Sequence, residues 1–245
     1  MADPKLRSPL VLSLVGGALL LAALGGGWAL GSRSSAAPAD DFDSRVHSYI
    51  VSHPEVLVEA AEALRSQGSE RQLAEIAERV ATPYPGAVLG NPNGKVTLVE
   101  FTDFACTYCR GSVADVEALI AANPDLRVVV RELPIIAATS PDAARWGLAA
   151  AEQGKYPAFH KAMFAAGRTD TASIEAAARV AGLDLDRARK VIADPKVNAE
   201  IASNLDMARK LQISGTPSWV AGKQLIMGAV GRGALAKALI TARES

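Results

Sequence analysis

The sequence predicts an α/β fold for the chain from Gly86 onward, and three observations lead to this prediction. Two runs rich in β-branched and apolar residues, Gly94–Phe104 and Leu126–Ile135, have the composition of buried strands. A long alanine-rich block with helical character extends from Pro141 to Leu211. Two short strand patterns around Ala221-Gly222 and a final helical pattern then complete the order strand, helix, strand, helical block, hairpin, helix.

Each helical element has a local signal of its own. After the first strand, apolar residues recur at helical spacing on one face, at Val113, Val116, Leu119 and Ile120. The alanine-rich block is divided by residues that end helices, namely Gly154, Gly167, Gly182 and Asp194-Pro195. We therefore expect several short helices in the block rather than one long helix.

The composition is that of an ordinary globular protein and argues against nucleic-acid binding. The chain has 245 residues, with 26 basic and 26 acidic side chains, and 49% of it is hydrophobic. A balanced charge leaves no basic patch for phosphates, and an aromatic content of 5% is too low for a base-stacking platform. This length allows one or two domains with a sizeable core.

The N-terminus has the pattern of a membrane segment, which we assign to residues 1–33. Lys5 and Arg7 precede an uncharged apolar run from Leu10 to Leu30, and a helix of that length would reach roughly 31 Å, close to the hydrocarbon thickness of a bilayer. The alternative is a cleaved signal peptide, for which Ala37-Pro38-Ala39 offers a small-x-small site. Either interpretation exports the remaining chain to a compartment where thiols can be oxidised.

A linker and a short helical extension are expected next, at residues 34–41 and 42–82 respectively. In the extension, Pro54 suits the first turn of one helix, and a second helix is expected after Gly68. Their apolar stripes lie at Leu57, Ala60, Ala61 and Leu64 and at Leu73, Ile76, Ala77 and Val80. Short amphipathic helices need a partner for such stripes, which is either the main domain or another copy of the chain.

The chain has only two cysteines, Cys106 and Cys109, and their position indicates redox chemistry. A disulfide across two intervening residues closes a very short loop, so it removes little entropy from the unfolded chain. The pair follows the end of the first strand, at the start of a helix, where unpaired N–H groups and the macrodipole favour a thiolate. We therefore predict that Cys106 is the nucleophile and that Cys109 is the buried resolving thiol.

A metal site is the alternative interpretation of the two cysteines. It needs further ligands, and His47 and His53 have a zinc-like spacing of their own but lie far upstream in a separate element. We therefore expect no metal site, while a non-enzymatic copper- or zinc-handling envelope protein remains the alternative function.

The chain from about Gly86 to its C-terminus resembles the thioredoxin superfamily, and specifically exported thiol-disulfide oxidoreductases of the DsbA type. The matching features are the strand, Cys-x-x-Cys and helix at "EFTDFACTYC", the stretch "SGTPSWV", which resembles the family's cis-proline loop, and the helical block. The resemblance implies a thioredoxin fold over residues 86–245, with an inserted helical domain at about 138–212. Its cofactor would be only the redox-active Cys106–Cys109 disulfide.

The same resemblance implies roles for five further residues. Glu100 would be a buried acid that shuttles the Cys109 proton, unless it is an exposed edge-strand glutamate. Thr216 and Pro217 would pair with an extended substrate, which Thr107 and Tyr108 would also contact. The family often has proline or glycine after the first cysteine and histidine before the second, so Thr107 and Tyr108 point to a less oxidising disulfide.

The stretch "VHSYIVSHPEVLVEAAEALRS" resembles the amino-terminal extension of the ScsC and Com1-like branch. In that branch such extensions can assemble oligomers, some of them trimers with isomerase activity. The resemblances together imply an oxidase or isomerase of the cell envelope or periplasm, anchored to the inner membrane or released by signal cleavage. Its partners would be exported proteins with cysteines, a membrane redox partner and copies of itself.

Overall fold

The computed structural model describes residues 39–244, which divide between Ala61 and Glu62 into two compact units. The predicted membrane segment at residues 1–33 lies outside the described residues. Among the residues that are described, no helix is both long and apolar enough to cross a membrane.

Two helices form the N-terminal extension, α2 (Ala39–Ser52) and α3 (Glu55–Ala81). The predicted linker at 34–41 therefore ends in helix, because α2 already begins at Ala39 and includes the two aspartates that follow. The expected break at Gly68 is wrong, since α3 continues through it. A glycine inside a helix costs only about 1 kcal/mol, and the buried side chains of Leu73 and Val80 stabilise the turns that follow.

A five-stranded sheet forms the centre of the second unit, with strand order β1-β3-β2-β4-β5. The central pair, β2 and β3, is parallel, and the other neighbours are antiparallel. Strand β1 was not expected from the sequence, because three residues that end in a glycine give too little alternation to recognise. The strands are β1 (Val88–Gly90), β2 (Val96–Thr102), β3 (Leu126–Glu132), β4 (Ser218–Ala221) and β5 (Gln224–Met227).

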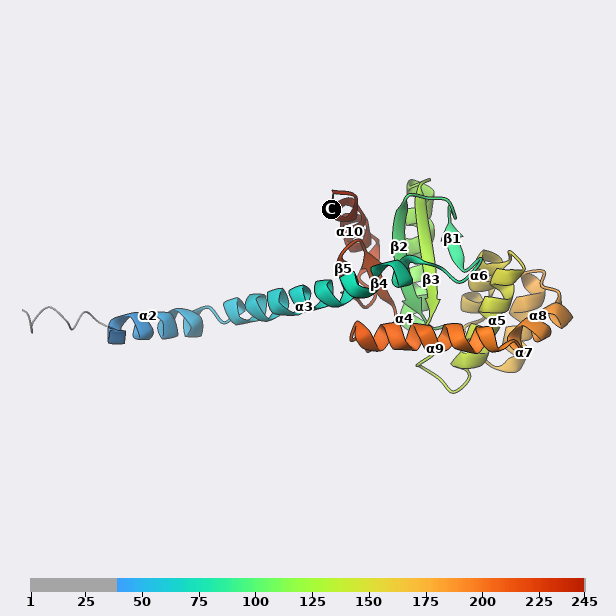
Figure 1. The fold of residues 1–245 in the computed structure, drawn as a ribbon, viewed down its shortest axis with the longest axis horizontal. Coiled ribbons are helices and arrows are strands. Elements are labelled where there is room, and N and C mark those ends of the chain that lie inside the picture. Colours follow the sequence, from blue (N-terminus) through green and yellow to red (C-terminus); the bar gives the residue numbers. More distant parts are fainter. Residues whose placement is uncertain (1–38, 245) are drawn as a thin grey trace, which may run out of the picture. The chain divides into compact units, whose positions relative to one another are not determined.

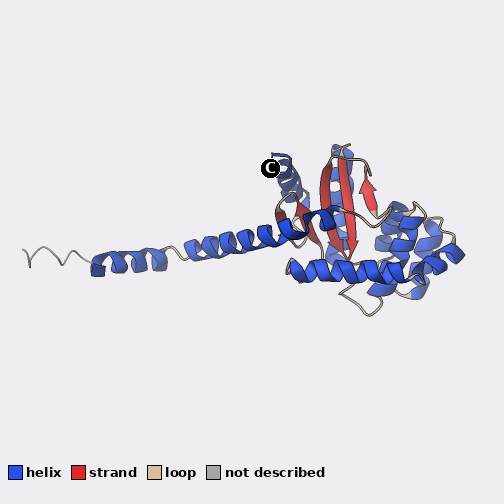
Figure 2. Cartoon of the chain, viewed as in Figure 1, coloured by secondary structure: helices blue, strands red, loops and turns tan. Residues whose placement is uncertain are grey.

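The remaining helices agree with the predicted order. Helix α4 follows β2, a helical insertion of five helices separates β3 from β4, and α10 closes the chain (Figures 1 and 2). Their bounds are α4 (Thr107–Ala122), α5 (Ser140–Glu152), α6 (Tyr156–Ala166), α7 (Thr171–Val180), α8 (Leu185–Ile192), α9 (Pro195–Lys210) and α10 (Gly231–Glu244).

Two hydrophobic clusters cover the two faces of the sheet. On one face, Leu98, Val128 and Trp219 pack with side chains of α4, α10 and the insertion. On the other face, Phe101 and Val129 pack with the C-terminal half of α3 and with the end of α9. The predicted stripes of the extension thus have different environments: Leu73 and Val80 are buried on the sheet, whereas Leu57 and Leu64 are exposed.

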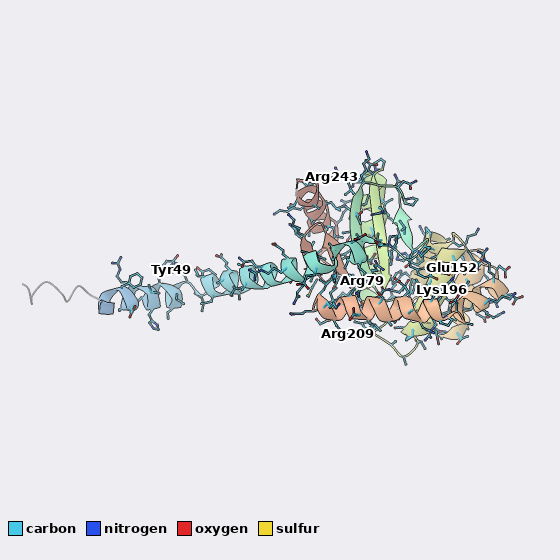
Figure 3. All side chains as sticks on the ribbon, viewed as in Figure 1. Tyr49, Arg79, Glu152, Lys196, Arg209 and Arg243 are labelled. Carbon is cyan, nitrogen blue, oxygen red and sulfur yellow. The ribbon has the colours of Figure 1, made fainter. Side chains whose placement is uncertain are left out.

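Exposed ion pairs also connect neighbouring helices of this unit. Figure 3 labels Glu152 of α5 and Lys196 of α9, whose charged groups lie 3.0 Å apart. It also labels Arg79 of α3, which donates a hydrogen bond of 2.6 Å to Asp206 of α9. These exposed pairs contribute little free energy individually, so burial rather than charge pairing holds the unit together.

Candidate active site

The two cysteines lie where β2 gives way to α4. Cys106 is the N-cap residue of α4, and its Sγ accepts a hydrogen bond of 3.4 Å from the backbone N–H of Cys109. An N-cap sulfur lies where unpaired amides concentrate positive potential, so this position suits a thiolate. Both thiols are free and buried, and Cys109 is fully enclosed.

The loop before β4 lies against the first cysteine. The Cys106 thiol donates to the backbone oxygen of Thr216 at 3.2 Å, and the Thr216–Pro217 peptide bond is cis. The oxygen of Pro217 accepts a hydrogen bond of 2.9 Å from the Gly228 N–H. The fold therefore brings together two segments, around residues 106 and 216, that are far apart in the sequence.

Cys109 has surroundings that oppose its ionisation. Burial raises the pKa of the Cys109 thiol, and the nearby hydroxyls of Thr102 and Thr216 counter this only in part. The carboxyl of Glu100 lies close enough to raise the pKa of Cys109 further. A thiol of this kind needs a proton acceptor before it can attack another sulfur.

Glu100 lies on β2, between β3 and β4, so it is not on an edge strand. Its side chain is 2% exposed, and burial raises the pKa of Glu100 to about 8. A carboxyl that titrates near neutral pH is suited to accepting and returning a proton in that range. Glu100 lies near enough to Cys109 for its charge to raise the pKa of that thiol.

The two residues between the cysteines face solvent at the first turn of α4. Thr107 is exposed, and Tyr108 is 70% exposed. Neither side chain can place a positive charge beside Cys106. Both are accessible to a protein substrate.

Sequence reasoning missed two further acids at this site, Asp103 and Glu132. Asp103 is buried, and its carboxyl accepts three backbone hydrogen bonds, from Ala105 at 2.9 Å and from Ile135 and Ile136 at 2.8 Å each. Glu132 is buried at the end of β3 and accepts a hydrogen bond of 2.7 Å from the Tyr156 hydroxyl. The available signal for each was an acidic residue at the end of a strand or directly after it.

The histidines that suggested a metal site do not form one within the part of the chain that the structure describes. His53 contacts Ser52 and the oxygen of Tyr49, and its ring stacks on that of Tyr49. His160 is buried among aromatic rings. Across residues 39–244, no group of three or more potential metal ligands is found.

Comparison with known proteins assigns the family. Residues 97–240, more than half of the chain, match the family described as DSBA-like thioredoxin domain. The chain belongs to the DSBA-like thioredoxin family. Residues 40–70 in addition match the family described as copper resistance protein ScsC N-terminal domain.

Solved structures with the same DSBA-like fold include both enzymes and ScsC proteins. A thioredoxin-like oxidoreductase from Silicibacter pomeroyi is 43% identical over 64% of this chain and 92% of its own, with a TM-score of 0.62. A linker-deletion mutant of Proteus mirabilis ScsC is 26% identical over 86% of this chain and 99% of its own, with a TM-score of 0.67. The thiol-disulfide exchange protein α-DsbA2 from Wolbachia pipientis is 25% identical over 73% of this chain and 97% of its own, with a TM-score of 0.66.

The curated relatives include a protein of another kind. A Na⁺/H⁺ antiporter, NhaA 3 from Salinispora tropica, is 32% identical over 158 residues, which are 63% of this chain. The chain spans only 24% of the length of that relative.

Proposed function

We propose that the protein is a thiol-disulfide oxidoreductase that forms, reduces or isomerises disulfides in exported proteins through Cys106 and Cys109. One observation favours this function above the others. Cys106, at the N-cap of α4, lies against the loop at Thr216, which precedes the cis proline. The buried thiol of Cys109 and the buried carboxyl of Glu100 lie close by. The DSBA-like family supports the same chemistry.

The proposed reaction has two exchanges. Cys106 as a thiolate attacks a client disulfide, so a Cys106–client bond forms and one client sulfur leaves as a thiolate. Cys109 then gives its proton to Glu100 and attacks Cys106 Sγ, which releases the second client thiolate and leaves the Cys106–Cys109 disulfide. The reverse sequence oxidises a client dithiol. No metal or organic cofactor takes part.

Trapping experiments test these roles. We expect Cys109→Ala to accumulate mixed disulfides with client proteins, because the resolving thiol is absent, and Cys106→Ala to accumulate none. Non-reducing gels of the two reduced variants, each mixed with an unfolded client that contains disulfides, measure this. Equal trapping by both variants, or by neither, would contradict the assigned roles.

We propose that the balance between the two directions lies toward isomerase or reductase activity. Thr107 and Tyr108 carry no positive charge, so the reduced form gains less stabilisation than it would from a neighbouring cation. Equilibration with glutathione buffers, with the two redox forms separated after acid quenching, measures the reduction potential. A potential as oxidising as that of a strong dithiol oxidase would reverse this assignment.

The N-terminal extension supports a further proposal, that the protein assembles into an oligomer such as a trimer. Three exposed apolar side chains of α2 lie on one helical face, at Phe42, Val46 and Tyr49. Others follow along α3, at Leu57, Val58 and Leu64. Each large side chain gains roughly 1.5 to 3 kcal/mol when it is buried, which favours a partner for this surface.

Light scattering on two proteins tests the assembly. A chain that begins at Asp41 should be oligomeric, and one that begins at Glu62 should be monomeric. The second chain starts at Glu62 rather than Gly86, because Leu73 and Val80 belong to the core of the second unit. The shorter chain should keep its dithiol chemistry and lose isomerase activity. A monomeric longer chain would refute the assembly.

We further propose that the protein acts in the cell envelope or periplasm, with residues 1–33 as its anchor or export signal. A related solved structure from Salmonella enterica is described as a periplasmic thioredoxin-like protein. Fractionation of cells with and without an alkaline wash separates an anchored protein from a soluble one. Antiporter activity is not proposed, because the chain matches only 24% of that relative.

A further inference from the structure

Glu132 lies on the same face of the sheet as Glu100 and Thr102. In the parallel pair of β2 and β3, Thr102 is the register partner of Glu132, and Glu100 is the partner of Val130. Side chains two residues apart on a strand share a face, and register partners in neighbouring strands do so too. Thr102 therefore neighbours Glu132 across the strands and Glu100 along β2, and its hydroxyl lies near the Cys109 thiol.

Three polar atoms of this group have no hydrogen-bond partner within the described part of the chain. They are Glu100 Oε2, Thr102 Oγ1 and Glu132 Oε2, and all three are buried. Buried polar atoms are nearly always paired, so three unpaired ones on adjacent positions beneath a reactive thiol need a functional explanation. Atoms that gain or lose a proton during a reaction provide one.

The Glu132 carboxyl is held in place on its other side. Its Oε1 accepts the Tyr156 hydroxyl at 2.7 Å, and its backbone oxygen accepts Asn204 Nδ2 at 3.1 Å. A methyl group added at Gly147 of α5 would lie 2.8 Å from Glu132 Oε1, so only glycine leaves room for the carboxyl there. The local sequence thus fixes the position of Oε1, while Oε2, the other carboxyl oxygen, has no hydrogen-bond partner.

No cation compensates the acids of this cluster among the residues that the structure describes. The titratable groups that affect Glu132 are Glu100 and Asp103, from β2 and the loop after it, and Tyr156 from α6, whose ring lies near that of His160. Burial raises the pKa of Glu132 well above its usual range, and the charges of Asp103 and Glu100 raise it further. An ionised Glu100 therefore favours the neutral form of Glu132.

We propose that Glu132 is a second buried proton-holding group for the Cys106–Cys109 pair, positioned by Tyr156 and coupled to Glu100, and that its carboxylate, once ionised, can accept the Cys109 proton in place of Glu100. This inference rests on the proposed function and deepens it. It makes the proton transfer a property of two carboxyls rather than one.

The step is balanced as follows. Cys109 Sγ bonds to Cys106 Sγ, the bond between Cys106 and the client breaks, and its electron pair leaves on the client thiolate. The Cys109 proton passes to the Glu100 carboxylate or, when Glu132 is ionised, to the Glu132 carboxylate. When Glu100 is replaced by glutamine, its charge no longer raises the pKa of Glu132, and Glu132 ionises at lower pH than before.

A double-mutant cycle tests the proposal on the full-length protein. The reduced protein is mixed with oxidised glutathione and quenched in acid, and mass spectrometry then counts its reduced, mixed-disulfide and oxidised forms from pH 6 to 10. We expect Glu100→Gln to slow resolution by only about 10-fold and to move its rise with pH to higher pH, because Glu132 substitutes. Glu100→Gln with Glu132→Gln should slow it by about 100-fold or more and abolish that rise, a loss larger than the product of the single effects.

Controls separate this proton role from a structural one. Tyr156→Phe in the Glu100→Gln background removes the bond to Glu132 and should shift the pH profile, whereas Glu117→Gln, an exposed acid of α4, should not. Formation of the Cys106–glutathione adduct needs neither carboxyl, so its rate reports an intact site in every variant.

The outcomes distinguish the two levels of inference. If the wild-type protein forms no adduct at Cys106, the proposed function itself fails. If adducts form normally but the double variant equals the product of the single ones, or Tyr156→Phe leaves the profile unchanged, the role of Glu132 is refuted.

Discussion

Replacing Arg131 by methionine should destabilise the protein strongly, because this one side chain holds α3 on the sheet. Arg131 is 2% exposed on β3, on the face opposite Glu132. Its Nε and Nη2 donate to the oxygen of Val80 at 3.1 and 3.0 Å, and Nη2 also donates to the oxygens of Arg79 and Thr82. The carbonyls of Arg79 and Val80 belong to the last turn of α3 and have no partner inside the helix, and that of Thr82 follows its end.

The size of the expected loss in stability follows from the ion pair that the same guanidinium makes with Glu200. Nη1 of Arg131 lies 2.8 Å from the carboxylate of Glu200, and burial lowers the pKa of Arg131 while Glu200 opposes that shift. Removing one partner of a buried pair typically costs about 3 to 5 kcal/mol. The Glu200 side chain is 18% exposed and keeps some hydration, so we expect the lower end, about 3 kcal/mol.

Urea unfolding of the reduced protein, followed by circular dichroism, measures this loss. In a domain of this size about 3 kcal/mol corresponds to a fall in Tm of roughly 6 to 12 °C. Arg168→Met removes an exposed ion pair with Asp170 and should cost less than about 1 kcal/mol. A loss below about 1 kcal/mol for Arg131→Met would refute the assigned role, and partial recovery in Arg131→Met with Glu200→Gln would support it.

Two further substitutions probe the acids beneath the cysteines. Burial raises the pKa of Glu100 to about 8 in the folded protein, whereas in the unfolded chain it has its normal value of 4.5. Between these pH values the folded protein binds a proton that the unfolded chain has released. The free energy of unfolding should therefore fall as pH rises, by up to about 1.4 kcal/mol per pH unit for this group. Urea midpoints at pH 5 and 8 measure this. Glu100→Gln should make the fall smaller, while Glu132, whose pKa burial also raises, leaves a part of it; an unchanged slope would contradict the titration of Glu100. Gly147→Ala should displace the Glu132 carboxyl from Tyr156 and cost about 1 to 3 kcal/mol by overpacking against Glu132 and Phe104, whereas unchanged stability would show that the cluster can relax.

The sequence predicted the elements whose signals are local and repeated. The strands around Val99 and Val129 and the helix after the cysteines have long apolar patterns, and the structure confirms them. Strand β1 was not predicted, because three residues at the edge of a sheet have too short a pattern of their own and are identified only by their pairing with β3. The break at Gly68 was wrong because a weak local preference was outweighed by packing further along the helix.

The site was predictable where a motif marks it and not where the fold assembles it. Cys106 and Cys109 are recognisable from their spacing, and Glu100 from its position on the preceding strand. Arg131 and Glu132 are adjacent in the sequence and look like one polar end of a strand. Strand alternation sends them to opposite faces, one to the end of α3 and the other to the cluster beneath Cys109, and only the packing of helices on both faces gives each its role.

The hydrogen bonds of Asp103 make two backbone amides into reporters of the active site. Ile135 and Ile136 have partly exposed side chains on a loop, where amides normally exchange with solvent within seconds, yet both N–H groups are bound by a buried carboxyl three residues before Cys106. Their hydrogen exchange should therefore be slow, and it should accelerate only when the segment around Asp103 opens. Deuterium uptake at these two positions, followed with and without a bound client, would thus time the opening of the cysteine loop without any label on the cysteines themselves.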